Sequence, residues 1–371
     1  MRTSVWLAVT LGFVSTSVVL ARTPLRQQGP GLKASQDARE AAVLTTCRRN
    51  HPGPPIAFAA VAKQPRPKAF PAPTTVEAIP GVIAAGTHWR SIWHESGNNA
   101  DGIVGTRDGG LLVAQQDNSD VVKIDAAGHA SVLYKDTNTG GALSIDKQGQ
   151  LFVVERGLHQ AIWKLAPSRT MLADSYEGDS IDCLGNYGLN DLTAAGNGGV
   201  YFTVGGLYYA APDGTITRQG TVSNTNGIIL SPDEKTLYVT SGAFGQPHGT
   251  LVAFDVQSDG MLTNPRTFAQ LTGGGDGSTI DSQGRIYVTS GSVIDVLSPA
   301  DGRLLGVIPA PKGDDLISVA FGGRGKHTLF AVGLAAKFAK GGLGLPSDKM
   351  KQGAEISAIR MLAHGYVGRA K

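Results

Sequence analysis

A unit of two strands joined by a turn recurs six times between Gly102 and the end of this chain. In each copy a small or turn residue precedes an alternating apolar strand, an Asp/Gly-type turn and a second strand of β-branched or aromatic residues. The first apolar residues after the six turns are Leu111, Leu151, Val200, Leu237, Ile286 and Leu329. Their separations of 40, 49, 37, 49 and 43 residues match the length of a four-stranded blade. The sequence therefore predicts an all-β fold, a six-bladed β-propeller.

The positions just before the inner strands are the first candidates for function, because in a propeller the loops that lead into these strands converge on the central axis. Three of them carry an oxygen-bearing side chain followed by glycine: Asp101, Asn226 and Asp276. The pair Asn190-Asp191 stands at the equivalent place in the third copy. Gathered on one axis, these side chains would form an all-oxygen site for a hard divalent cation. Ca²⁺ is the first choice, with Mg²⁺, Mn²⁺ or Zn²⁺ as alternatives.

The same dipeptides have a purely structural interpretation. Asp-Gly and Asn-Gly are common in hairpin turns, where they supply residues with positive φ. The shared phase of the candidates in the repeat favours a joint metal site, because hairpin turns such as Asp108-Gly109 and Asp213-Gly214 fall elsewhere in the unit.

Charge and motifs exclude some other classes of function. A net charge of +3 with mixed signs and no basic stripe argues against a nucleic-acid partner. No Ser/His/Asp order and no Gly-x-Ser-x-Gly motif is evident, which argues against a serine esterase.

The first 21 residues have the pattern of a signal peptide: Met1-Arg2, an apolar run, and Val19-x-Ala21 before Arg22. The run is short of the roughly 20 residues that span a bilayer. We therefore expect cleavage, export to the periplasm or the extracellular space, and no stable membrane span afterwards. The alternative is an uncleaved membrane anchor.

The rest of the chain divides into a predicted arm and the predicted propeller. Residues 22–74 are rich in Pro and Ala and should form a poorly ordered arm, and residues 75–371 should form the propeller. The apolar residues of Val76–Ile83 predict a strand, and Ile356–Leu362 predicts a partner that helps to close the last blade. The Gly/Lys-rich stretch between Leu334 and Lys351 predicts a long loop.

The two cysteines, Cys47 and Cys183, would lie in an oxidising compartment if the chain is exported. They could pair. We favour unpaired thiols, because Cys47 belongs to the predicted arm and nothing in the sequence brings it to Cys183.

Part of the chain resembles the senescence marker protein/gluconolactonase/luciferin-regenerating-enzyme family over roughly Asp101 to Phe330. The resemblance lies in Asn190-Asp191-Leu192, in Asn197-Gly198-Gly199-Val200-Tyr201-Phe202-Thr203, in the run from Asn226-Gly227-Ile228 to Tyr238-Val239, and in Phe254-Asp255-Val256 with Asp259-Gly260. It implies a six-bladed propeller with one divalent cation on the axis. It also implies an enzyme that hydrolyses lactones or, in some members, phosphoesters.

The resemblance also implies roles for individual residues. Asn226 and Asp276 would be metal ligands, and Asn190 a metal-proximal or substrate-binding amide. We add Asp101 as a ligand from its phase, Asp191 as a substrate-binding neighbour, and Asp276 as the base that takes a proton from the attacking water. His159 and His248 would assist substrate binding or leaving-group protonation if their loops reach the mouth.

Two departures from the family pattern keep other functions open. The chain has Asp101-Gly102-Ile103 where the family usually has Glu-Gly-Pro, and Phe202-Thr203-Val204 where relatives often have Phe-Thr-Asp. The first hypothesis is an exported, metal-dependent lactone or ester hydrolase that works as a monomer on a small molecule. The alternatives are a non-catalytic propeller scaffold with a structural cation or none, and a degenerate enzyme that has lost activity.

Overall fold

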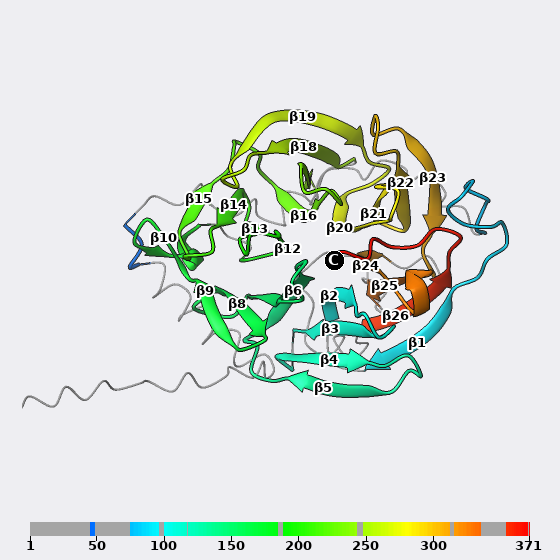
Figure 1. The fold of residues 1–371 in the computed structure, drawn as a ribbon, viewed down its shortest axis with the longest axis horizontal. Helices are drawn as coiled ribbons and strands as arrows, with labels where there is room; N and C mark the ends of the chain where they lie inside the picture. Colours follow the sequence, from blue (N-terminus) through cyan, green and yellow to red (C-terminus); the bar gives the residue numbers. More distant parts are fainter. Residues whose placement is uncertain are drawn as a thin grey trace, which may run out of the picture.

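The computed structural model describes residues 45–48, 75–95, 100–116, 118–184, 188–242, 248–311, 315–334, 354–369 and 371. Six four-stranded antiparallel sheets stand around one central axis (Figure 1). The predicted six-bladed propeller is therefore confirmed. The predicted signal peptide, most of the predicted 22–74 arm and nearly all of the loop predicted after Leu334 lie outside the described residues.

Each of the first five blades is a meander of consecutive strands. The blades are β2 (Ala100–Gly105), β3 (Leu111–Gln115), β4 (Asp120–Ile124) and β5 (Ala130–Tyr134); β6 (Gly140–Ile145), β7 (Leu151–Glu155), β8 (Ala161–Ala166) and β9 (Thr170–Ala173); β12 (Leu192–Ala194), β13 (Val200–Thr203), β14 (Leu207–Ala210) and β15 (Ile216–Arg218); β16 (Thr225–Leu230), β17 (Thr236–Ser241), β18 (Thr250–Val256) and β19 (Leu262–Gln270); and β20 (Gly275–Ile280), β21 (Ile286–Ser290), β22 (Val293–Leu297) and β23 (Leu304–Pro309). The first strand of each blade is its inner strand, and the second strands are almost wholly buried.

The sixth blade joins the two ends of the propeller. It contains β24 (Leu316–Gly322), β25 (Thr328–Leu334) and β26 (Ala354–Arg360), and β1 (Arg90–Glu95) pairs with β26 as its outer strand. The predicted partner in Ile356–Leu362 is confirmed as β26. Closure by strands from both ends of the chain ties the first and last blades together.

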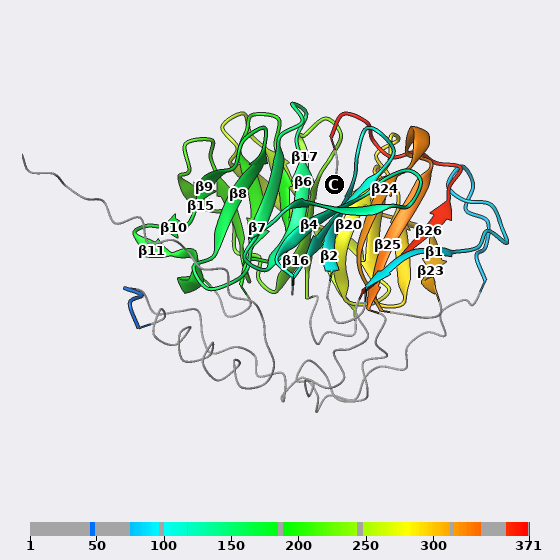
Figure 2. The same cartoon turned by 90° about the horizontal axis from the view of Figure 1, so that it is seen from below.

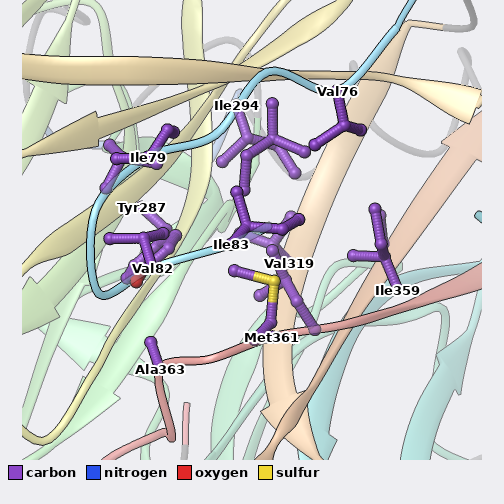
Figure 3. Packing of buried hydrophobic residues seen from close by; sticks show 14 of the residues in the cluster. Val76, Ile79, Val82, Ile83, Tyr287, Ile294, Val319, Ile359, Met361 and Ala363 are labelled. Carbon is purple, nitrogen blue, oxygen red and sulfur yellow. The ribbon is translucent and has the colours of Figure 1, made fainter. Parts of the chain in front are cut away.

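The predicted strand at Val76–Ile83 is wrong. These residues form a tight reversal in which Ile79 bridges Ile83, with Gly81 at φ 69°. Their apolar side chains pack into a cluster with Tyr287 and Met361 (Figure 3). The apolar residues of this segment reflect burial of a turn between the fifth and sixth blades. The strand that closes the last blade is β1 instead.

Among the described residues, short elements outside the blades are a hairpin of β10 (Ser175–Tyr176) with β11 (Asp179–Ser180) and the 3₁₀ turns η1 (Ile181–Cys183) and η3 (Arg324–Lys326). Cys183 at the end of η1 forms a disulfide with Cys47. The preference for unpaired thiols is therefore wrong, because residues 45–48 of the arm lie against this hairpin, where the Arg48 amide donates to the buried Asp179 carboxylate at 3.1 Å.

No helix among these described segments is long and apolar enough to cross a membrane.

Candidate active site

Five of the described inner strands carry a β-bulge at their first residues. The register with the second strand shifts between Ala100 and Ile103 in β2, between Gly140 and Leu143 in β6, between Thr225 and Ile228 in β16, between Gly275 and Ser278 in β20, and between Leu316 and Ser318 in β24. A bulge changes the direction in which its side chains point. Asp101, Asn226 and Asp276 all lie within these bulges, so the repeat delivers three oxygen-bearing side chains at equivalent places around the axis.

The glycine after each of these residues serves close packing between blades. A Cβ on Gly227 would lie 2.0 Å from the main-chain oxygen of Asp276 in the next blade, and Gly102 meets the start of β6 almost as closely. Neither glycine has a positive φ, whereas Gly109 and Gly214 in the hairpin turns have φ of 86° and 87°. The Asp-Gly and Asn-Gly pairs at the axis are therefore not the turn dipeptides that the structural interpretation assumed.

A small cavity on the axis is lined by four of the predicted site residues, Asp101, Asn190, Asp191 and Asp276, together with Lys371. Its free volume is about 10 Å³, on the order of what one ordered water molecule needs. Carboxylates from the first, third and fifth blades thus line one cavity.

Asn226 does not line this cavity but is buried, and the glycine that follows it packs against the main chain of Asp276. Its side-chain oxygen accepts no hydrogen bond from any residue that the structure describes. An amide oxygen left unpaired in the interior is unfavourable by about 1–3 kcal/mol. A cation on the axis would satisfy it, so the residues present fit the divalent ion that their pattern predicts.

The composition of this set suits an oxygen-loving cation. Asp101 and Asp276 supply carboxylates and Asn226 supplies an amide oxygen, the donors that Ca²⁺ takes in proteins. Over the described ranges, no group of three or more His, Cys, Asp or Glu side chains is arranged to hold a metal. The candidate site therefore depends on the amide as its third donor.

Burial raises the pKa of the Asp276 carboxyl well above its usual value, and the neighbouring charges of Asp101 and Asp191 raise it further, while Arg156 acts in the opposite direction. A carboxyl in such surroundings is stabilised by a proton or by a cation. This combination of a cavity, a perturbed carboxyl and neighbouring charged groups is typical of functional sites.

Arg156, which follows β7, places its guanidinium against two residues that line this cavity. It donates to the Asp101 carboxylate and to the main-chain oxygen of Asn190, and its side chain is 17% exposed. A Cβ on Gly141 would lie 2.1 Å from Arg156 Nε, so the guanidinium lies flat on a strand start that has no side chain. These contacts fix the position of the Arg156 side chain next to the candidate site.

Three hydrogen bonds hold the carboxylate of Asp191, which also lines the cavity. Its carboxylate accepts hydrogen bonds from the main-chain amides of Leu192 at 2.8 Å and Ile228 at 2.9 Å. It also accepts one from the ammonium of Lys371. Burial lowers the pKa of Lys371, and the charge of Asp191 opposes that shift. All of these contacts are made within the protein. Asp191 therefore links the third and fourth blades.

The two predicted histidines lie away from the axial cavity. His159 is exposed and lines a separate cavity of about 250 Å³ with Gln160, Asp174, Ser175 and Ser180. His248 is exposed and its ring lies 3.2 Å from the main-chain oxygen of Thr272. The structure does not bring either ring together with Asp276.

Sequence reasoning missed Arg156 and Lys371. Arg156 follows a second strand rather than preceding an inner strand, so the phase of the repeat did not point to it. A signal was available, because the loops after second strands open on the same face as the loops before inner strands. Lys371 lies beyond the last predicted strand and has no place in the repeat.

The family model described as "SMP-30/Gluconolactonase/LRE-like region" matches residues 134–333. Among curated proteins, a gluconolactonase from Zymomonas mobilis is 28% identical over 239 residues. That match covers 55% of this chain and 64% of the relative, so the chain spans less than two thirds of that protein's length.

Solved structures show the same fold at lower identity. A gluconolactonase from Xanthomonas campestris superposes with a TM-score of 0.62 at 22% identity, over 81% of this chain and 99% of that one. A structure described as a calcium-binding protein, regucalcin, from Agrobacterium tumefaciens has a TM-score of 0.58 at 18% identity, over 75% of this chain and 95% of that one.

Proposed function

Since this chain belongs to the SMP-30/gluconolactonase/LRE-like family, we propose that it is a metal-dependent hydrolase that opens a lactone or a related ester at the axial cavity. The observation that carries the proposal is the unpaired, buried side-chain oxygen of Asn226. The glycine after Asn226 packs against the main chain of Asp276, and Asp276 lines the axial cavity with Asp101. The similarity to a gluconolactonase supports a cyclic ester as the substrate.

Asp101, Asn226 and Asp276 would hold the cation, with Ca²⁺ the first choice because a calcium-binding protein shares the fold and the donors are all oxygen. When bound, the ion supplies Lewis acidity for the ester carbonyl. Asp276 takes a proton from the attacking water, a task for which a raised pKa suits a carboxylate. The Asn190 amide and the Arg156 guanidinium orient the substrate's oxygen atoms at the mouth.

Export is part of the proposal. The disulfide between Cys47 and Cys183 supports it, because disulfides persist in oxidising compartments. The signal-like pattern of residues 1–21 points the same way. Cell fractionation of the tagged protein tests this, with recovery in the cytoplasmic fraction as the contrary result.

The decisive experiment measures metal content by elemental analysis and turnover of a panel of sugar and aliphatic lactones with added Ca²⁺, Mn²⁺ or Zn²⁺. We expect about one divalent ion per chain and metal-dependent hydrolysis. Asp276→Asn should lower kcat/KM at least about 100-fold and change the Tm little. The matched control is Asp213→Asn, an Asp-Gly pair in an exposed hairpin turn, which should leave both unchanged.

Two results would overturn the proposal. Bound metal without turnover of any lactone would indicate a scaffold or an enzyme that has lost activity. Purified protein that binds no divalent ion would show that Asp101, Asn226 and Asp276 serve only packing between blades.

A further inference from the structure

The residues after β26 run across the face of the propeller that lies opposite the candidate mouth and end on the axis (Figures 1 and 2). Gly365 forms a bridge with Asp281, and the Tyr366 amide donates to the oxygen of Ile280 at 3.3 Å. Ile280 is the last residue of inner strand β20, whereas the site residues lie at the strand starts. This segment, Met361–Lys371, therefore enters the central channel from the far end; we call it the axial tail.

Buried cations fasten the axial tail. Arg369 is 5% exposed and donates to the hydroxyl of Thr193 at 3.0 Å and to the main-chain oxygens of Leu230 and Ser231. The ammonium of Lys326 in η3 donates to the main-chain oxygen of Tyr366 at 2.7 Å. These charge-assisted hydrogen bonds fix the path of the tail up to its last residue.

Lys371 extends from this anchored segment into the axial cavity. Its ammonium donates to the Asp191 carboxylate and, at 2.7 Å, to the main-chain oxygen of Ile228. Its own main-chain oxygen accepts a hydrogen bond from the Thr279 hydroxyl at 2.7 Å. The Lys371 side chain is 6% exposed and lines the same cavity as Asp101 and Asp276.

We propose that Lys371 is a positioning residue that acts as a built-in counter-cation of the axial site, holding Asp191 and weakening the binding of the divalent ion. The inference rests on the cation site of the proposed function. Three carboxylates line the cavity, and the Lys371 ammonium is the cation that lines it with them. A positive charge in the same small, poorly solvated space repels a divalent ion, and Asp191, engaged by Lys371, is withheld as a further ligand.

The test is the affinity for Ca²⁺, measured by isothermal titration calorimetry at pH 7 and by the rise of the Tm with Ca²⁺ concentration. Lys371→Gln removes the charge and keeps a polar side chain. We expect it to tighten Ca²⁺ binding at least about tenfold, while Lys371→Arg, which keeps the charge, stays near the wild-type value. The control is Lys235→Gln, which makes the same change of net charge at an exposed turn and should leave the affinity unchanged.

The sign of the effect separates this role from a structural one, because damage to the tail would loosen the site and weaken Ca²⁺ binding. An unchanged or weaker affinity in Lys371→Gln, with Ca²⁺ bound by the wild type, would overturn this inference and leave the proposed function standing. Wild-type protein that binds no divalent cation would overturn the proposed function instead.

Discussion

The guanidinium of Arg156 in the second blade forms an ion pair with the carboxylate of Asp101 in the first, a residue that lines the axial cavity. Both side chains are mostly buried, with 17% and 20% of their surfaces exposed. The pair joins a residue that the repeat singles out to one that it does not. Because Asp101 is also a candidate cation ligand, Arg156 competes with a divalent ion for the same oxygen.

Arg156→Met should therefore have two effects of opposite sign. It should tighten Ca²⁺ binding about tenfold, because Asp101 is released. It should also lower kcat/KM for a lactone at least about tenfold, because the substrate loses a donor at the mouth. Calorimetry and steady-state kinetics measure the two effects separately.

A second variant displaces the guanidinium without removing it. Gly141→Ala would put a methyl group 2.1 Å from Arg156 Nε, and a long side chain can swing away from such a clash. We expect its kcat/KM to fall in the same direction as in Arg156→Met with little change in Tm. Full activity in both variants would show that Arg156 does not position substrate.

The sequence predicted the fold and the bulged residues because both follow from the repeat. Asp101, Asn226 and Asp276 occupy the same position in their repeats. A propeller arranges equivalent positions of its inner strands around one axis. The Val76–Ile83 segment was mispredicted because a buried turn and a buried strand share an apolar pattern. The pairing of Cys47 with Cys183 is a contact across 136 residues, and no local pattern encodes it.

Gly227 should tolerate no side chain, because its neighbour across the blades is main chain. A Cβ there would lie 2.0 Å from the Asp276 oxygen, and two packed inner strands cannot both move. We expect Gly227→Ala to lower the free energy of unfolding by about 2 kcal/mol or more. Gly149→Ala is the comparison, with φ of 84° and open space around its Cβ position, where left-handed strain alone should contribute about 1 kcal/mol. Equal losses in urea denaturation would contradict the packing role of Gly227.

The disulfide should stabilise the fold without serving the axial site. Cys47 and Cys183 are separated by 136 residues, and cross-linking a loop of that length reduces the entropy of the unfolded chain. The double variant Cys47→Ser/Cys183→Ser should lose about 2–5 kcal/mol of unfolding free energy and keep its Ca²⁺ affinity. Wild-type protein treated with dithiothreitol should have the same urea midpoint as the double variant. If dithiothreitol leaves the wild-type midpoint unshifted, the disulfide is not formed in solution.

The buried Lys326 should make stability depend on pH. Burial, together with the charges of Arg369 and Arg107, lowers the pKa of this ammonium to about 8. In the unfolded chain the pKa returns to about 10.5. Between these values the unfolded state binds more protons than the folded state, so the contribution of Lys326 to stability rises with pH. Below about pH 8 the ammonium is charged in both states, and its burial is unfavourable.

Lys326→Met removes this titration and leaves the others in place. The difference in unfolding free energy between wild type and variant should therefore move in favour of the wild type by about 2 kcal/mol between pH 7 and about pH 9.5. Urea denaturation of both proteins at the two pH values measures it, and tyrosines that titrate higher cancel in the comparison. A free-energy difference that stays constant or moves the other way would show that Lys326 keeps an ordinary pKa. Its hydrogen bond to the Tyr366 oxygen would then be exposed to solvent rather than buried.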